Sequence, residues 1–111
     1  MKILYDFLFF EDADTNGVSD NELKIANQGA QAAVSVTGDA VGLQLYISGR
    51  VDYNTDEYTP LACINASNFN VTEFISGNGV YYIPTDGVNR LRAEIKAING
   101  GSATVVAKIG E

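Results

Sequence analysis

The sequence contains no histidine and no tryptophan, and it has one cysteine, one methionine and two prolines among its 111 residues. Without histidine, the chain lacks the usual general base, the most common zinc ligand and the usual partner of a catalytic serine. The single cysteine, Cys63, permits no internal disulfide, and its small or apolar neighbours in PLACINA indicate a buried small hydrophobic residue. The sequence also shows no phosphate-binding glycine loop, Cys/His cluster or nucleophile–base pair. We therefore predict that the protein is not an enzyme and holds no cofactor.

Long hydrophobic runs and positive charge are scarce as well. The longest apolar run, residues 3–10, is interrupted by an aspartate and is far shorter than the ~20 residues of a membrane span. Two acids follow it instead of the small residues of a signal-peptide cleavage site, so we expect the chain to start at Met1 in a cytoplasm. The net charge is −7, and residues 1–60 hold ten of the fourteen acidic residues but three of the seven basic ones. Since no basic stripe is evident, we predict neither nucleic acid nor a membrane as a partner.

What the sequence does contain is alternation of apolar and polar residues. Hydrophobic residues make up 46% of the chain, which is enough for a packed core. A period of two is typical of strands with one buried and one solvated face. Strands are predicted at residues 2–10, 33–38, 40–49, 91–98 and 103–109, with weaker ones at 22–26, 61–65 and 79–84. The residues predicted to share inward faces are Ile3, Tyr5, Phe7, Phe9, Val34, Val36, Val41, Leu43, Leu45, Ile47, Leu91, Ala93, Ile95, Ala97, Ala103, Val105, Ala107 and Ile109.

Clusters of glycine, asparagine and aspartate separate these segments. INGGSATV is the strongest hairpin signal, because Asn99-Gly100 can supply two residues with positive φ between strands. The one helical candidate is residues 70–76, with Asn70 as a possible cap. We predict an all-β chain, a single antiparallel β-sandwich or jelly-roll-like domain over residues 1–111, with about eight strands and at most one short helix.

The stretch DADTNGVSDNEL resembles the start of a calcium loop. The residues that match the pattern are Asp12, Asp14, Asn16, Gly17 and Asp20. The position that requires a bidentate glutamate is Leu23, and Glu22 lies one residue early. Strand-like sequence flanks the loop on both sides, so the helix–loop–helix frame is missing. We favour an acidic, turn-rich connection between two strands, and a weak non-helical calcium site stays open as the alternative.

The sequence offers residues for two other kinds of site, a glycosidase centre and a sugar-binding platform, and each has a simpler interpretation. A glycosidase needs two acids across a cleft, and three acids occur in RVDYNTDEYTP: Asp52, Asp56 and Glu57. Acids on a solvated loop are the simpler interpretation. A sugar-binding platform would need exposed aromatic residues, for which Tyr53, Tyr58, Tyr81 and Tyr82 are available. In GVYYIP one tyrosine must point inward and one outward, which core packing already explains.

The C-terminal third of the chain carries a family resemblance. ISGNGVYYIPTDGVNRLRAEIKAINGGSATVVAKIGE, residues 75–111, resembles the closing segment of small accessory structural proteins of tailed bacteriophages and prophages. SDNELKIANQGAQAAVSVTG and LQLYISGRVD resemble the first half of such domains, so the resemblance covers roughly residues 19–111. The shared pattern consists of strands and turns and includes no catalytic signature.

The resemblance implies a β-sandwich that assembles into a virion as a head-decoration, head-fibre or tail-associated protein. The expected partners are the major capsid protein or other virion proteins, together with further copies of the chain in a trimer. Tyr46, Arg50, Arg90 and Arg92, which the alternation places on outer sheet faces, are the candidate interface residues. The aromatic first strand is expected to fill the domain's own core, although pairing with a neighbouring copy is an alternative. A carbohydrate- or cell-surface-binding module, for example in a phage tail, is the alternative function.

Overall fold

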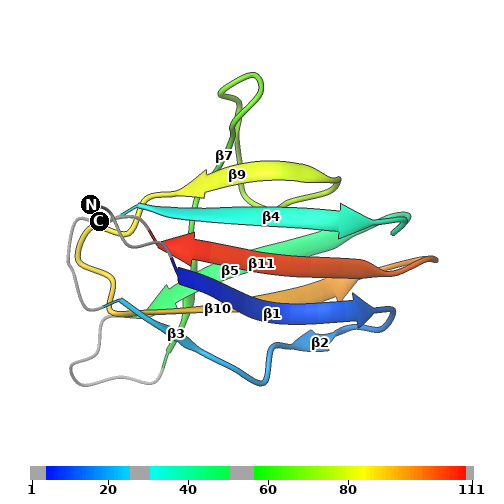
Figure 1. The fold of residues 1–111 in the computed structure, drawn as a ribbon, viewed down its shortest axis with the longest axis horizontal. Coiled ribbons are helices and arrows are strands. Elements are labelled where there is room, and N and C mark those ends of the chain that lie inside the picture. The colour runs from blue at the N-terminus through cyan, green and yellow to red at the C-terminus, as the bar shows by residue number, and fades with distance from the viewer. Residues whose placement is uncertain (1–4, 26–30, 51–56, 110–111) are drawn as a thin grey trace.

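The computed structural model describes residues 5–25, 31–50 and 57–109, and strands make up its regular structure (Figure 1). The strands are β1 (Tyr5–Ala13), β2 (Gly17–Val18), β3 (Leu23–Lys24), β4 (Ala32–Gly38), β5 (Gln44–Arg50), β6 (Thr59–Pro60), β7 (Cys63–Asn65), β8 (Val71–Thr72), β9 (Gly79–Ile83), β10 (Arg90–Ala97) and β11 (Ala103–Ile109). All pairings are antiparallel. A six-stranded sheet has the order β1-β11-β4-β9-β7-β8, and a five-stranded sheet has the order β2-β10-β5-β6 with β3 also on β10. The predicted all-β sandwich is confirmed.

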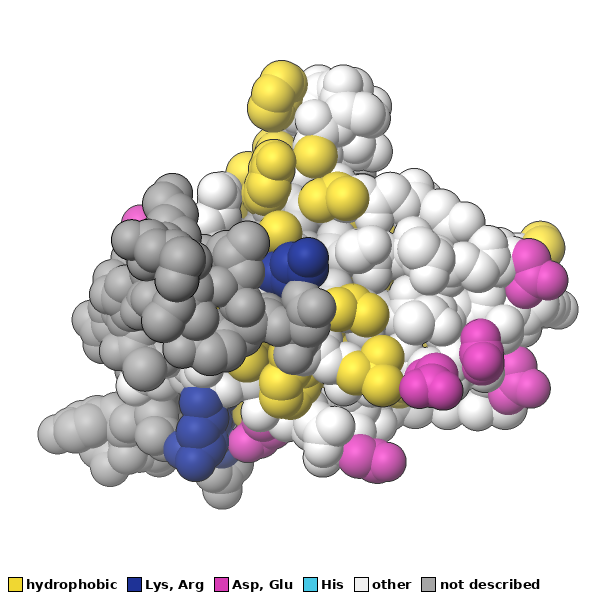
Figure 2. Space-filling model, viewed as in Figure 1, with side chains coloured by type: hydrophobic (Ala, Val, Ile, Leu, Met, Phe, Trp, Pro, Cys, Tyr) yellow, Lys and Arg dark blue, Asp and Glu magenta, His cyan; other side chains and the backbone are white. Residues whose placement is uncertain are grey.

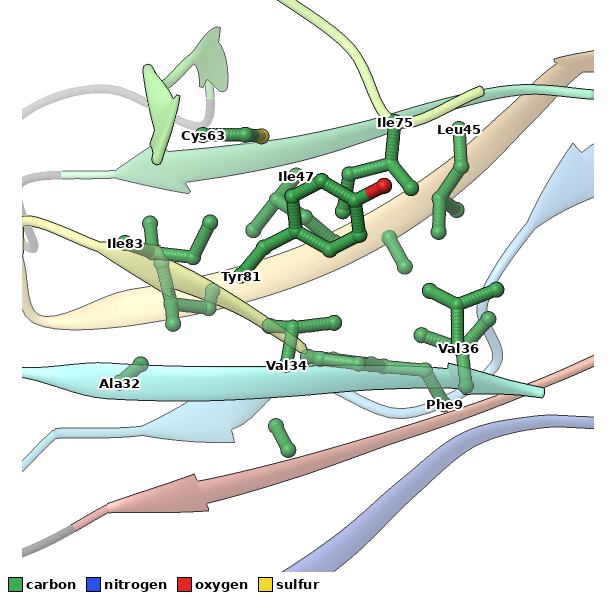
Figure 3. Close-up of a cluster of buried hydrophobic side chains, with 14 of the residues drawn as sticks. Phe9, Ala32, Val34, Val36, Leu45, Ile47, Cys63, Ile75, Tyr81 and Ile83 are labelled. Carbon is green, nitrogen blue, oxygen red and sulfur yellow. The ribbon is translucent and has the colours of Figure 1, made fainter. Parts of the chain in front are cut away.

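The hydrophobic core lies between the two sheets. β4 and β11 cover it from one side and β5 and β10 from the other, so that inward side chains of both sheets meet (Figure 3). Cys63 is fully buried in this core, as predicted, and burial raises the pKa of its thiol to about 11. The largest fully buried side chains are Leu45, Ile47, Ile75, Ile83, Leu91, Ile95, Val34, Val36 and Val105.

The predicted inward faces of β4 and β11 are confirmed, while those of β5 and β10 are each wrong at one end. In β10 a register shift after Ile95 places Ala97 opposite the exposed Gln44, and Ile98 packs against the core instead. Leu43, Leu45 and Ile47 are buried, but Val41 is 63% exposed. β5 begins only at Gln44, because Gly42 has a φ of +66° and breaks the extended chain between Val41 and Leu43. The alternation therefore restarts after this turn, and Val41 does not belong to it.

The predicted hairpin at Asn99-Gly100 is wrong. β10 and β11 do not pair, since β10 belongs to the five-stranded sheet and β11 to the six-stranded sheet. The positive φ of this connection is at Gly101 instead (φ +71°). The connection crosses from one sheet to the other beside the β4–β5 connection, to which it is hydrogen-bonded: Val41 N–H donates to the Gly100 carbonyl oxygen at 2.8 Å, and Asn99 N–H donates to that of Val41 at 2.8 Å. A Gly-rich turn between two alternating segments thus marks a crossing between sheets here.

The helix expected at residues 70–76 is also wrong. Val71 and Thr72 form β8, which pairs with β7 through Cys63 and Ile64. Ile75 forms a bridge to Leu45, with mutual backbone hydrogen bonds of 2.8 and 3.0 Å. Extended backbone prevails because Ile75 is fully buried between the sheets, where tertiary packing outweighs weak local helix propensity.

The aromatic strand β1 contributes to the core of its own domain. It pairs with β11, and the register shifts between Leu8 and Phe10 place Phe9 at a bulge. Phe9 is 5% exposed and contacts the half-buried Phe7 edge-to-face, with ring centroids 5.1 Å apart. The expectation that this strand fills the domain's own core is confirmed for these two rings. Ile3 and the side chain of Tyr5 lie outside the described residues.

Candidate functional site

The outer face of the five-stranded sheet gathers the candidate interface residues. Arg90 on β10 is opposite Arg50 on β5, Arg92 is opposite Ser48, and Glu94 is opposite Tyr46. Because side chains alternate along both strands, these residues project from the same side, away from the core. Tyr46, Arg50, Arg90 and Arg92 therefore lie on an outer sheet face, as the alternation predicted, and the structure places all four on the same one. Their contact with a partner stays a prediction.

Tyr58 lies at the centre of this face and holds two of the arginines. It precedes the edge strand β6, which pairs with β5 through Ser48 and Gly49. The guanidinium carbon of Arg92 lies 4.1 Å from the centroid of the Tyr58 ring, and that of Arg50 lies 5.4 Å away. Both distances are typical of cation–π contacts. Ser48 is only 5% exposed although it lies on the outer face, so side chains cover this part of the sheet. We call the outer face around Tyr58, Arg50 and Arg92 the Arg–Tyr face.

Glu22 joins the Arg–Tyr face from the segment before β3. Its Oε1 accepts a hydrogen bond from the Tyr58 hydroxyl, and its Oε2 lies 3.7 Å from Nη1 of Arg90. Burial raises the pKa of Tyr58 to about 12, with further contributions from the hydrogen bond to Glu22 and the charge of Glu22, while Arg50 and Arg92 act in the opposite direction. The phenol is therefore a neutral hydrogen-bond donor at ordinary pH. Glu22 compensates part of the positive charge of the arginines.

A second aromatic group continues the same face toward β8. Nζ of Lys96 lies 4.4 Å from the centroid of the Tyr46 ring, and the ring of Phe74 lies 5.4 Å from it. Next to Tyr46 is a groove with a volume of about 400 Å³. The residues that line this groove are Tyr46, Pro60, Leu61, Ala62, Val71, Thr72 and Glu73. Since β6 and β8 are the edge strands of their sheets, the groove lies where the edges of the two sheets meet.

Positive charge is concentrated on the five-stranded sheet, which the sequence did not reveal. Five of the seven basic residues of the chain are on its strands β3, β5 and β10: Lys24, Arg50, Arg90, Arg92 and Lys96. They come from three separate parts of the sequence, so no basic run exists for a sequence pattern to detect. The contacts of Tyr58 with Glu22, 36 residues away, were likewise not predictable from any local pattern. The arrangement offers charge and aromatic surface for binding carboxylate-bearing partners.

The calcium-loop residues are spread over two strands and the connections next to them: Asp12 is in β1, Asp14 and Asn16 precede β2, Gly17 is in β2, and Asp20 follows it. Asp12, with φ +49°, is at the end of β1, where its N–H donates to the Thr104 hydroxyl at 3.0 Å. Asn16 donates its side-chain amide to the Lys96 carbonyl oxygen at 3.0 Å, and Asp14 and Asp20 are exposed. The favoured interpretation of one connection between two strands is wrong in one respect, because β2 divides the segment into a β1–β2 and a β2–β3 connection. Within residues 5–25, 31–50 and 57–109 there is no group of three or more Asp, Glu, His or Cys side chains arranged to hold a metal ion.

The tyrosines and acids considered for sugar binding or glycoside hydrolysis are not gathered in one site within the described residues. Tyr81 is buried, its hydroxyl donates to the Gly77 carbonyl oxygen at 3.0 Å, and burial raises its pKa, whereas Tyr82 is half-buried on the outer face of its sheet. One tyrosine inward and one outward is what the sequence predicted. Asp52, Asp56 and Tyr53 lie outside the described residues, and Glu57 is exposed. No helix in the described part of the chain is long and apolar enough to cross a membrane.

The fold has counterparts among solved structures. No protein-family model and no curated protein matches the sequence. The structure is similar to that of the SPBc2 prophage-derived protein YomS, with a TM-score of 0.83 and 19% identity over 100% of this chain and 96% of that chain. It is also similar to the PBSX exported protein XepA, with a TM-score of 0.87 and 19% identity over 99% of this chain and 38% of that chain. At this identity the likeness concerns the fold, which this chain shares with phage-derived proteins.

Proposed function

We propose that this chain is a structural protein of a tailed-phage virion that acts by protein–protein contact, most specifically an auxiliary protein that decorates and stabilises the head. The observation that carries the proposal is the Arg–Tyr face, a preformed charged and aromatic surface on a sandwich whose fold occurs in phage-derived proteins. Repeated over a symmetric shell, modest contacts of this kind sum to stable attachment.

The Arg–Tyr face sets the chemistry of the contact. Arg50 and Arg92 are held over one ring, so little side-chain entropy is lost when they meet a partner. Arginine binds carboxylates in a bidentate manner, which favours an acidic patch on the major capsid protein or another virion protein. The role is one of binding rather than catalysis, and copies of the chain are expected to associate as a trimer, a state that sedimentation analysis of the purified protein measures.

The alternative, carbohydrate binding, has weaker support. Sugar platforms use exposed ring faces, but the rings of Tyr46 and Tyr58 already carry Lys96 and Arg92 at cation–π distance. A saccharide would have to displace these cations. Binding on a glycan array would favour the alternative, and its absence together with attachment to particles would favour the structural role.

The test is the composition of purified phage particles. The wild-type chain is expected in the particles, and electron microscopy shows whether it lies on the head, neck or tail. Arg92→Glu is expected to lower the number of copies per particle, because it reverses charge at the centre of the Arg–Tyr face. The matched control is Lys108→Glu, an equal charge reversal on β11 of the other sheet, with an unchanged copy number. Absence of the wild-type chain from particles, or equal loss with both variants in folded protein, contradicts the proposal.

A further inference from the structure

Two segments from opposite edges of the five-stranded sheet meet over its outer face. Glu22 directly precedes β3, which pairs with β10, and Tyr58 directly precedes β6, which pairs with β5. The strands β10 and β5, which carry the arginines, lie side by side between these two segments. The hydrogen bond from the Tyr58 hydroxyl to Oε1 of Glu22 therefore joins the two edges across the Arg–Tyr face.

The backbone on either side of Glu22 is fixed to β10. Ser19 N–H donates to the Ala93 carbonyl oxygen at 2.8 Å, and the Ser19 hydroxyl oxygen accepts from Ala93 N–H at 3.1 Å. Leu23 is buried and lies opposite Leu91 on the same strand. These anchors do not involve the side chain of Glu22. That side chain can therefore turn toward solvent while the backbone stays in place.

The contact of Glu22 with Arg90 is a loose ion pair. Oε2 of Glu22 lies 3.7 Å from Nη1 of Arg90, whereas a direct charge-assisted hydrogen bond measures about 2.7–2.9 Å. The side chain of Glu22 is 38% exposed. Partly exposed ion pairs of this kind contribute little to stability. A carboxylate of another protein, which is not tied to the backbone before β3, can replace Glu22 at small cost.

Arg92 carries a donor that the described residues leave unused. Its Nε is buried and has no hydrogen-bond partner within residues 5–25, 31–50 and 57–109. A buried N–H without an acceptor costs stability, so its presence needs an explanation. The ring of Tyr58, 4.1 Å from the guanidinium carbon, covers this group and is itself held by the hydrogen bond to Glu22. Release of that hydrogen bond frees the ring to shift and lets an acceptor reach the donor.

Glu22 is placed differently from the acids at the end of β1. Figure 2 shows acidic side chains gathered toward the end of the molecule where β1 ends, and Glu11, Asp12 and Asp14 are exposed there. Glu22 instead has one oxygen on a phenol and the other beside a guanidinium group. Arginine and a neutral phenol both donate hydrogen bonds, so the ligand of this position is a negatively charged acceptor. Glu22 itself shows that a carboxylate fits.

We propose that Glu22 is an internal ligand in the carboxylate-binding position of the Arg–Tyr face, and that an aspartate or glutamate of the binding partner displaces it. The incoming carboxylate takes over the hydrogen bond from Tyr58 and the contact with Arg90. This inference rests on the proposed function and adds how its contact is regulated. An internal competitor weakens each single contact, which suits attachment through many contacts that are weak one by one.

The first test measures carboxylate binding by the purified, ¹⁵N-labelled chain. The probe is the capped peptide acetyl-Asp-Glu-amide, and the neutral acetyl-Asn-Gln-amide is the control ligand. NMR signals of the arginine Nε–H groups are expected to shift with the acidic peptide alone. Glu22→Ala is expected to bind it about fivefold more tightly, because the competing carboxylate is gone. Shifts that are absent from the wild-type chain and from this variant overturn the proposal.

The matched control is Glu94→Ala, which removes an equal charge from the same outer face of β10. It is expected to change the affinity less than about twofold, because Glu94 is opposite Tyr46 rather than beside Arg90. An equal gain in both variants would show a general charge effect and overturn the proposal. An unchanged or weaker affinity of Glu22→Ala would mean that Glu22 positions the arginines, and it would overturn the proposal too.

Tyr58→Phe provides a second test that keeps the ring over the arginines. The variant lacks the hydroxyl that holds both the internal and the incoming carboxylate. It should therefore bind the acidic peptide more weakly, and adding Glu22→Ala to it should raise the affinity less than about twofold. A full fivefold gain in the Tyr58→Phe background would show that Glu22 does not compete for this hydroxyl.

The outcomes separate this proposal from the proposed function. Particles that contain the chain, together with no gain of Glu22→Ala over Glu94→Ala, overturn the internal ligand alone. A fivefold gain that is specific to Glu22→Ala, while purified particles lack the chain, supports the internal ligand and contradicts the virion role.

Discussion

The crossing of the β4–β5 and β10–β11 connections allows a quantitative test at Gly101. Gly101 has a φ of +71°, and a Cβ there would overlap the Asp39 carbonyl oxygen and lie 2.7 Å from its carbon and 2.8 Å from Oδ1 of the same residue. The same place carries two hydrogen bonds between the connections, from Asp39 N–H to the Ser102 carbonyl oxygen (3.0 Å) and from Ser102 N–H to Oδ1 of Asp39 (2.9 Å). Gly101→Ala is therefore expected to disturb the junction of the two sheets.

The expected loss has two parts. Alanine in the left-handed region costs roughly 1 kcal/mol, and overlap with backbone atoms that cannot rotate away costs roughly 1–3 kcal/mol more. The free energy of unfolding should fall by about 2–4 kcal/mol, which for a domain of about 100 residues lowers the melting midpoint by roughly 8–16 °C.

Two other glycines separate these contributions. Gly87 has a φ of +76° but open space around its Cβ position, so Gly87→Ala should lose only about 1 kcal/mol. Gly100 has open space and no positive φ, so Gly100→Ala should change stability by less than about 0.5 kcal/mol or raise it slightly. Urea unfolding of the three variants measures the series. If Gly101→Ala lowers the free energy of unfolding no more than Gly87→Ala does, the two connections do not approach each other as closely as described.

Three further predictions concern the Arg–Tyr face, the core and the acidic loop. Absorbance titration should show one tyrosine, absent in Tyr58→Phe, that ionises near pH 12. Because the unfolded state loses this proton first, near pH 10, stability should fall as pH rises from about 10 to 12, and it should fall less in Tyr58→Phe. Leu45→Ala should destabilise the fold by about 2–5 kcal/mol in urea unfolding, whereas Val41→Ala should change it by less than about 0.5 kcal/mol, and equal losses would contradict the burial of one and exposure of the other. Millimolar calcium should leave the melting midpoint unchanged relative to chelator, and a clear rise would establish a site in the acidic connection after β1.

The sequence was sufficient for features that depend on near neighbours in the chain. The inward positions of β10 and β11, such as Leu91 and Val105, follow from a period of two, because adjacent side chains of a strand must take opposite faces. The same rule placed Arg90 and Arg92 outside. The buried Cys63 followed from its apolar neighbours.

Pairing between strands was decided by the tertiary structure. The Gly-rich turn after β10 satisfies the sequence requirements of a hairpin, yet the next strand joins the other sheet, because closing the core requires β11 between β1 and β4. Local sequence cannot distinguish a turn within a sheet from a crossing between sheets, since both need glycine. The segment after β8 is extended for a similar reason, since Ile75 is buried and bridges to Leu45, which is distant in sequence.

The Arg–Tyr face likewise combines features that the sequence predicted with features that only the tertiary structure decided. Alternation within β5 and β10 determined that Tyr46 and the arginines point outward. Only the folded chain brings Glu22 and Tyr58 beside them, because strand pairing joins segments that are distant in sequence. On this face the sequence thus determined which way Tyr46 and the arginines point, and the packing of the two sheets determined their neighbours.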